Sequence, residues 1–138
     1  MTLAIQTLLD AALEAVTDIP TVQVENTNVN TVGAITPWVR GTLLPSRSTP
    51  LTIGVGAMKT MSGLYQVDCF YPRAQGSEAG RTMADAIVAA FPMGLQLTDG
   101  TITVNIVMAS VLTTRPGSTT STVNYPVEIE WTVYTQGR

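Results

Sequence analysis

The spacing of the hydrophobic residues changes between positions 63 and 91, from every second residue to every third or fourth. The first part alternates apolar and polar residues, which is typical of a half-buried strand. Its apolar positions are Tyr65, Val67, Cys69 and Tyr71. Pro72 ends this alternation, and Gly76 with Ser77 predicts a turn and a helix N-cap. The following apolar residues have helical spacing, at Met83, Ala84, Ile87, Val88 and Phe91. The segment therefore predicts a strand and a helix that folds back over its apolar face.

The N-terminal part of the chain also shows helical spacing. An amphipathic helix is predicted over residues 3–16, and Pro20 cannot continue it. Its apolar positions are Leu3, Ile5, Leu8, Leu9, Ala12, Leu13 and Val16. Val22 and Val24 suggest a short strand, and residues 38–44 indicate another strand that Gly41 weakens.

Two alternating segments near the C-terminus predict a long β-hairpin. The first follows a short strand at 95–97 and an Asp99-Gly100 turn, and its apolar positions are Ile102, Val104, Ile106 and Met108. The second has apolar positions at Tyr125, Val127, Ile129, Trp131 and Val133. We expect both strands to exceed ten residues and to span roughly 35 Å. The hairpin is therefore expected to project beyond the core as an arm, with its tip at about 113–122.

A polar stretch over residues 45–62 is rich in Pro, Ser, Thr and Gly and predicts a long loop, with a short strand suggested at 51–55. This loop and the 113–122 tip lack apolar anchors, so we expect both to be mobile in the free protein. The chain shows no repeat and is expected to form a single domain over 1–138. The order of elements predicts an α+β fold, in which an N-terminal and a central helix pack on a mostly antiparallel sheet.

Composition narrows the possible partners. Only 12% of the 138 residues are charged, whereas soluble domains usually carry about 25%. This favours a surface of uncharged polar residues that is partly buried against partners. The net charge of −3 and seven scattered basic residues argue against a nucleic-acid partner. No apolar run reaches the roughly 18 residues of a membrane span. The N-terminus lacks the basic region of a signal peptide, so a cytosolic protein is expected.

Catalytic chemistry is poorly supported by the residues present. Histidine is absent, which removes the commonest general base and the usual zinc ligand. Cys69 lies in the alternating pattern of a strand and is interpreted as a core residue. Residues 54–60 resemble a phosphate-binding loop, but Met58 stands where such a loop needs glycine before Lys59. We therefore expect no enzyme activity, no cofactor and no metal.

The remaining polar and aromatic residues have simple interpretations. Glu128 and Glu130 lie on one face of a predicted strand, which indicates a solvated face, or one that meets a basic partner surface. Asp68 on its own strand is interpreted in the same way. Trp38 and Trp131 are expected to be core residues.

Four segments together resemble the tail terminator (tail completion) proteins of long-tailed bacteriophages, in particular the lambda-like type. They are PWVRGTLLPSR at 37–47, GLYQVDCFYP at 63–72, MADAIVAAF at 83–91 and YPVEIEWTVY at 125–134. The resemblance implies a structural protein that forms a ring, usually of six copies, on the last ring of the tail tube. Such a ring stops tube polymerisation and provides the surface that joins the head.

The resemblance also implies where the protein acts and what it contacts. The implied partners are further copies of itself, the tail tube protein, a head-completion or neck protein and the tape-measure protein. The implied location is the host bacterial cytoplasm during assembly and then the head-proximal end of the virion or prophage tail. Six charged residues are candidates for the assembly interface: Arg40, Arg47, Lys59, Arg115, Glu128 and Glu130. The alternatives are another neck or minor tail component, such as a head–tail connector, and a small-ligand-binding α+β domain.

Overall fold

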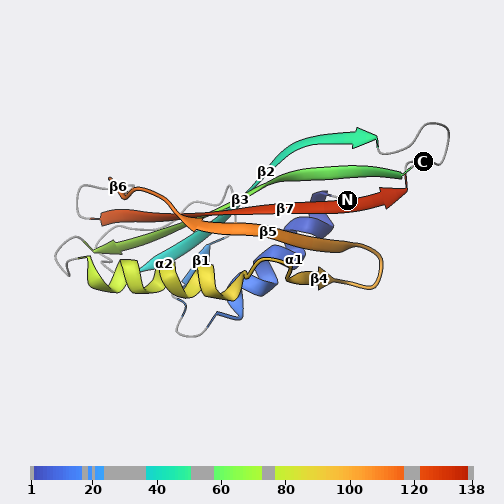
Figure 1. Ribbon diagram of the computed structural model, residues 1–138. Helices are drawn as coiled ribbons and strands as arrows, with labels where there is room; N and C mark the ends of the chain where they lie inside the picture. Colours follow the sequence, from blue (N-terminus) through green and yellow to red (C-terminus); the bar gives the residue numbers. More distant parts are fainter. Residues whose placement is uncertain are drawn as a thin grey trace.

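The computed structural model describes residues 2–16, 19, 21–23, 37–50, 58–72, 77–116 and 122–136. Two helices and one seven-stranded sheet are formed by these residues. Their bounds are α1 (Thr2–Glu14), β1 (Thr21–Gln23), β2 (Trp38–Pro50), β3 (Met58–Pro72), α2 (Glu78–Ala90), β4 (Gln96–Thr98), β5 (Thr103–Val111), β6 (Arg115–Pro116) and β7 (Thr122–Gln136). Both helices lie against the same face of the sheet (Figure 1), which we call the inner face. The expected α+β fold is confirmed.

The strands are ordered β1-β2-β3-β7-β5-β4, and β6 pairs with β7. Only β1 and β2 run parallel, and every other pair is antiparallel, as expected for most of the sheet. Residues of β2, β3, β7 and β5 line up across the sheet in rows. Two rows on the same face are Thr42–Gln66–Glu128–Ser110 and Leu44–Leu64–Glu130–Met108.

The core lies between the helices and the inner face. The four alternating positions predicted in β3 are all buried, and they share one hydrophobic cluster with Met83 and Ile87 of α2 and with Phe91, the C-cap of this helix. The predicted strand and folded-back helix are therefore confirmed. The alternating positions of β7 are buried in the same cluster, and α1 adds Ile5, Leu9 and Leu13. Leu3 is 76% exposed, contrary to the prediction. It stands two residues before Ile5, about 200° around the helix and so away from the buried side.

Gly41, which weakens the strand prediction for β2, makes room for a ring of the neighbouring strand. A Cβ at this position would lie 2.0 Å from the hydroxyl oxygen of Tyr65. The Tyr65 side chain crosses this space, and its hydroxyl donates a hydrogen bond to the Asp10 carboxylate of α1. The missing side chain in β2 thus lets β3 attach to the N-terminal helix.

The start of α2 also depends on a glycine. Ser77 occupies the predicted N-cap position, but its side chain makes no capping hydrogen bond. Its carbonyl accepts a hydrogen bond of 3.0 Å from the backbone N–H of Arg81. One turn into the helix, Gly80 faces the ring of Tyr125, and an added Cβ would lie 2.2 Å from that ring. The absence of a side chain at Gly80 therefore lets α2 pack closely on β7.

The prediction of a long loop over 45–62 is wrong for much of this segment. Residues 45–50 belong to β2 and residues 58–62 to β3, and the two segments pair as far as Pro50 and Lys59. Proline is tolerated here because β2 lies near the edge of the sheet, where its missing N–H breaks no ladder on the open side. A register shift between Pro45 and Arg47 accommodates one extra residue. Residues 51–57, with the strand suggested at 51–55, lie outside the described residues, and the mobility of this segment stays a prediction.

The C-terminal hairpin is present, but its first strand is shorter than predicted. Nine residues form β5, whereas fifteen form β7. Within the expected tip, Arg115 and Pro116 pair with β7, and Thr122 already belongs to β7. Residues 117–121 lie outside the described residues. The part of the sheet that extends past the helices is formed by β2, β3 and β7 at the opposite end (Figure 1).

The Asp99-Gly100 turn between β4 and β5 agrees with the prediction. Gly100 has a φ of 93°, a left-handed conformation that favours glycine. The Asp99 carboxylate accepts hydrogen bonds from the backbone N–H groups of Thr101 at 2.8 Å and Ile102 at 2.9 Å. These bonds lower the pKa of Asp99, with Ile102 as the larger cause and Thr101 as the next.

Candidate assembly surface

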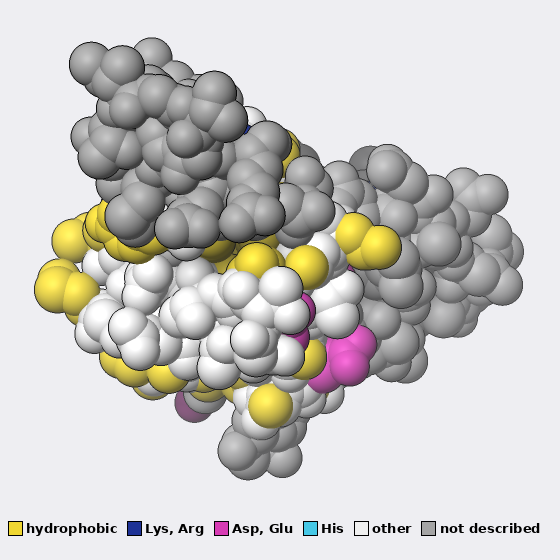
Figure 2. Space-filling view, turned by 90° about the vertical axis from the view of Figure 1, so that its right-hand side faces the viewer, with side chains coloured by type: hydrophobic (Ala, Val, Ile, Leu, Met, Phe, Trp, Pro, Cys, Tyr) yellow, Lys and Arg dark blue, Asp and Glu magenta, His cyan; other side chains and the backbone are white. Residues whose placement is uncertain are grey.

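The face of the sheet turned away from the helices, which we call the outer face, carries exposed apolar side chains near its two edges. Met108 of β5 is 50% exposed and Leu44 of β2 is 42% exposed. Along β5, the bulged Val107 is exposed as well, and so is Val111, which pairs with the buried Val127 and therefore lies on the inner face at the strand edge. Seen from the end where β4 joins β5, the described surface is mostly uncharged, with scattered hydrophobic side chains (Figure 2). The sparse charge of the sequence is thus reflected at this end of the molecule.

A β-bulge places Met108 on the outer face. The register shifts between Ile106 and Met108, so that Ile106 pairs with Trp131 and Met108 with Glu130. The extra residue, Val107, turns the rest of the strand over. The expected alternation therefore holds to Ile106, which is buried, and fails at Met108.

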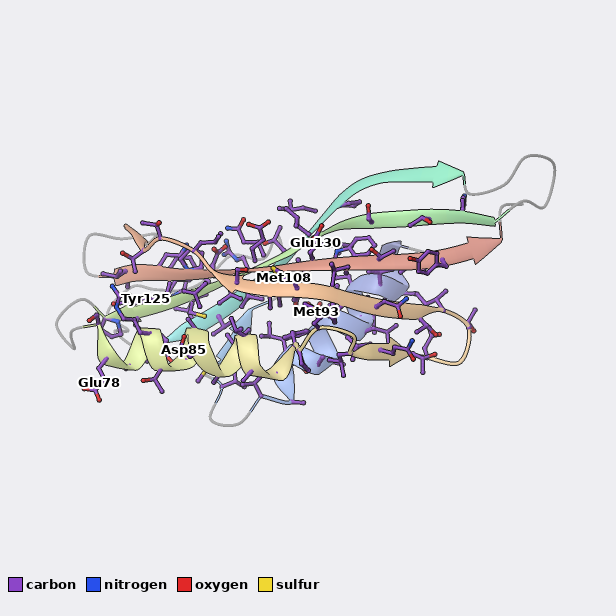
Figure 3. All side chains as sticks on the ribbon, viewed as in Figure 1. Glu78, Asp85, Met93, Met108, Tyr125 and Glu130 are labelled. Carbon is purple, nitrogen blue, oxygen red and sulfur yellow. The ribbon has the colours of Figure 1, made fainter. Side chains whose placement is uncertain are left out.

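The bulge creates a shallow groove between β5 and β7. Its volume is about 230 Å³, and it is lined by Met108, Ser110, Leu112, Glu128 and Glu130. Figure 3 shows Met108 and Glu130 close together on the side of the sheet away from α2. Neither Glu128 nor Glu130 forms an ion pair with Arg40, Lys59 or Arg81, the basic residues whose side chains the structure describes. The groove thus combines apolar walls with two carboxylates that are not paired with any of these three cations.

The six sequence-predicted interface residues are only partly brought together. Glu128 and Glu130 share the groove. Arg40 lies on the same outer face but on β2, with β3 between it and β7. Lys59 has the same parity along β3 as Tyr65 and so belongs to the inner face, beside Thr135 of β7. For the other two residues the structure gives only backbone pairing, which joins Arg47 to Ser62 and Arg115 to Asn124. That these residues contact partners stays a prediction.

Arg40 belongs to a small aromatic cluster on the outer face. The rings of Trp38 and Phe70 stack with centroids 4.0 Å apart and an interplanar angle of 17°. The guanidinium carbon of Arg40 lies 5.0 Å from the centre of the Trp38 ring, within the range of a cation–π interaction. Trp38 is buried, as expected, but on the face opposite the main core. This contact holds Arg40 at the β2 edge of the outer face.

Polar residues beside this cluster are bonded to each other. The Asp68 carboxylate accepts hydrogen bonds from the side-chain amides of Gln66, at 2.9 Å, and Asn124, at 3.0 Å. Asp68 is therefore not the freely solvated residue that the sequence suggested. The bond from Asn124 joins β7 to β3, and the two bonds together fix these polar side chains on the outer face.

The structure offers little for catalysis. Cys69 is fully buried, and its pKa is raised to about 12, mainly by burial and secondarily by the charge of Asp68. Its thiol is therefore protonated at neutral pH, in agreement with a core role. In the described ranges no group of three or more potential metal ligands is found. No described helix is long and apolar enough to span a membrane.

The main feature that sequence reasoning missed is the position of the open strand edges. Beside β2, the short β1 pairs only with Trp38, Val39 and Arg40. At the other side of the sheet, β4 pairs only with the first three residues of β5, Thr103 to Asn105. Residues 41–50 and 107–111 therefore have no strand on their outward side in the described part of the chain. No local pattern could reveal this, because it depends on which strands become neighbours.

Comparisons with known proteins give a consistent picture. The family model described as phage tail terminator protein matches residues 4–131. One solved structure is 21% identical in sequence and superposes with a TM-score of 0.70, covering 95% of this chain and 91% of its own. At this identity the likeness shows a shared fold. No curated protein matches the chain.

Proposed function

The chain belongs to the phage tail terminator protein family, whose model covers nearly all of it, and from this premise we propose that it ends the growing tail tube as an oligomeric ring. The family membership makes it a structural protein of the phage tail. We further propose that the ring has six copies, caps the last ring of tube protein and provides the surface that joins the head. The family match is the observation that carries this proposal.

The outer face supports an assembly role. Exposed Met108 and Leu44 lie on a sheet face that the described helices do not cover. Apolar side chains in such a position are stabilised when a partner removes them from water. Few charged residues would have to be desolvated in the same step, because only 12% of the chain is charged.

We propose that the tail tube protein binds one rim of the ring and a head-completion or neck protein binds the other. The tape-measure protein is a further candidate at the tube side. Assembly would take place in the host cytoplasm, and the finished ring would remain at the head-proximal end of the tail.

The proposal is tested by adding the purified protein to polymerising tail tube protein. We expect shorter tubes with one closed end in electron micrographs, and rings of this chain by native mass spectrometry. Tubes of unrestrained length, together with a protein that stays monomeric in their presence, would refute the proposal. A head–tail connector is distinguished by binding a neck protein while leaving tube length unchanged.

The small-ligand alternative finds less support. Ligand sites are usually concave enough to bury most of the ligand. The groove beside Met108 is shallow and bounded by Glu128 and Glu130. A thermal shift of several degrees with a small metabolite would favour that alternative.

A further inference from the structure

We propose that neighbouring copies in the ring join edge to edge, with the open edge of β5 in one copy pairing with the open edge of β2 in the next. The proposal rests on the ring assembly of the proposed function and names the surfaces that build it. Its occupant is a second copy of this chain. Four features of the described residues support it.

The first feature is the position of the two open edges along the strand direction. Register runs without interruption from Gly41 to Leu44 in β2, through β3 and β7, to the facing residues of β5. In this order Gly41 shares a row with Val111, and Leu44 shares a row with Met108. Residues 41–44 of β2 and 108–111 of β5 thus lie at the same height on opposite sides of the sheet. A second copy placed beside the first, at the same height, brings one edge against the other.

The second feature is strand direction. The pairs β2–β3, β3–β7 and β7–β5 are all antiparallel, so β5 runs opposite to β2. A second copy in the same orientation therefore presents a β2 that is antiparallel to β5 of the first. The alternation continues across the junction, and the contact is head-to-tail, which is the type that closes into rings.

The third feature is the composition of the β5 edge. Its sequence, TVNIVMASV, has no charged residue and no proline, two of the devices that usually protect an exposed edge from pairing, and the bulge at Val107 lies before the open residues 108–111. Val107, Met108 and Val111 are 39%, 50% and 42% exposed. Side by side at the junction, Met108 of one copy and Leu44 of the next would form an apolar cross-strand pair on the outer face.

The fourth feature is charge. The groove beside β5 holds Glu128 and Glu130, which form no ion pair with Arg40, Lys59 or Arg81. The sequence of β2 contains two arginines, Arg40 and Arg47, and no acidic residue. Arg40 adjoins the open stretch of β2 that begins at Gly41, so the junction would bring one basic residue near the acidic groove, which favours the head-to-tail arrangement over a contact between two β5 edges.

Backbone groups for such pairing are available on β5. The N–H of Leu112 donates a hydrogen bond of 2.9 Å to the carbonyl of Pro126 in β7. Because these bonds alternate along an antiparallel strand, the N–H of Val111 points away from β7 and toward the open edge. A proline at this position removes an outward donor and leaves the bonds to β7 intact.

Disulfide crosslinking tests the junction directly. Met108→Cys and Leu44→Cys are introduced together, and the protein is oxidised gently in the presence of tube protein. Within one copy β3 and β7 separate the two positions, at roughly 14 Å, which is too far for a disulfide. We expect covalent multimers larger than dimers, whereas each single variant gives none.

The control pair is Met108→Cys with Met93→Cys, since Met93 is 75% exposed but lies on the helix side of the sheet (Figure 3). Multimers as abundant for this pair as for the test pair would overturn the proposal. Efficient dimers from Met108→Cys alone would also overturn it, because they indicate pairing of two β5 edges.

A matched pair of variants tests the backbone bonds. Val111→Pro removes the outward N–H, and Val111→Ala shortens the same side chain but keeps the N–H. We expect Val111→Pro to need at least a tenfold higher concentration for ring assembly than Val111→Ala, with circular dichroism showing both folded. Equal assembly of the two would refute edge pairing, and if Val111→Pro fails to fold, the crosslinking decides.

The two proposals can fail separately. A wild-type protein that neither shortens tubes nor forms multimers contradicts the terminator function itself. A wild-type protein that caps tubes, but whose Met108→Cys and Leu44→Cys pair does not crosslink, leaves that function standing and removes only the edge-to-edge junction.

Discussion

Replacing Gly80 by alanine should destabilise the protein, although the same change usually stabilises a helix. Gly80 lies in the first turns of α2 and is buried against Tyr125. An added Cβ would lie 2.2 Å, 2.3 Å and 2.7 Å from the Cε2, Cδ2 and Cζ atoms of that ring. These atoms belong to a ring that is only 4% exposed and packs edge-on against Tyr71, with centroids 6.3 Å apart. The ring therefore cannot move aside without disturbing the core.

Two opposing contributions set the size of the effect. Alanine is favoured over glycine inside a helix by about 1 kcal/mol. Forcing a methyl group into a packed core costs about 1–3 kcal/mol and occasionally more. Because the overlap with Tyr125 exceeds 1 Å relative to an ordinary contact of about 3.5 Å, we take the upper part of that range. The expected net loss in unfolding free energy for Gly80→Ala is about 1–2 kcal/mol, or roughly 3–8 °C in Tm.

Urea unfolding, followed by the fluorescence of the two buried tryptophans, measures this loss. Thr82→Ala is the matched control, because Thr82 is exposed on the same helix and its replacement should leave stability unchanged or raise it by a few tenths of a kcal/mol. The double variant Gly80→Ala with Tyr125→Leu should show a favourable coupling, since the smaller side chain makes room for the methyl group. A Gly80→Ala protein as stable as the wild type would refute the packing argument.

Three further predictions follow from the buried and hydrogen-bonded polar groups. Tyr65→Phe removes the bond to Asp10 of α1 and should lower the unfolding free energy by about 1–3 kcal/mol in urea; an unchanged midpoint would show that the bond contributes nothing. The Cys69 thiol, with a pKa of about 12, should not react with Ellman's reagent at pH 8 until the protein unfolds, and rapid labelling of the native protein would contradict its burial. The lowered pKa of Asp99 stabilises the fold above the unfolded value of 3.8, and this contribution is lost as the pH falls through the folded pKa. Asp99→Asn should therefore lose less stability than the wild type between pH 5 and pH 2 in thermal unfolding, and parallel pH profiles would argue against the turn bonds.

Much of the fold was predictable because the signals are local. The alternation around Cys69 and the helical spacing around Ile87 each need only a few consecutive residues, and both segments pack as expected. The Asp99-Gly100 turn is also encoded locally, since glycine is needed for its positive φ. These elements define the core and the family resemblance.

The features that were not predictable depend on contacts between distant segments. Pro45 and Pro50 indicate a loop by composition, yet they lie in β2 because that strand has an open side. The bulge at Val107, which moves Met108 to the outer face, leaves no mark in the alternation before it. The candidate surface follows from strand order and bulge together, so the charged residues selected from sequence alone cover it only in part.

The central place of β7 has a consequence for folding during synthesis. Residues 122–136 lie between β3 and β5, and the pairing of β3 with β7 joins residues that are at least 50 positions apart, since Pro72 pairs with Thr122. Contacts between such distant segments form slowly. Until β7 has left the ribosome, β2 and β3 can pair with each other, but β3 and β5 both lack β7, the strand that lies between them. We expect the nascent chain to remain without a closed core until that moment. A premature stop before residue 122 should therefore yield a product that is degraded rather than a smaller folded protein, which keeps incomplete chains out of the growing tail.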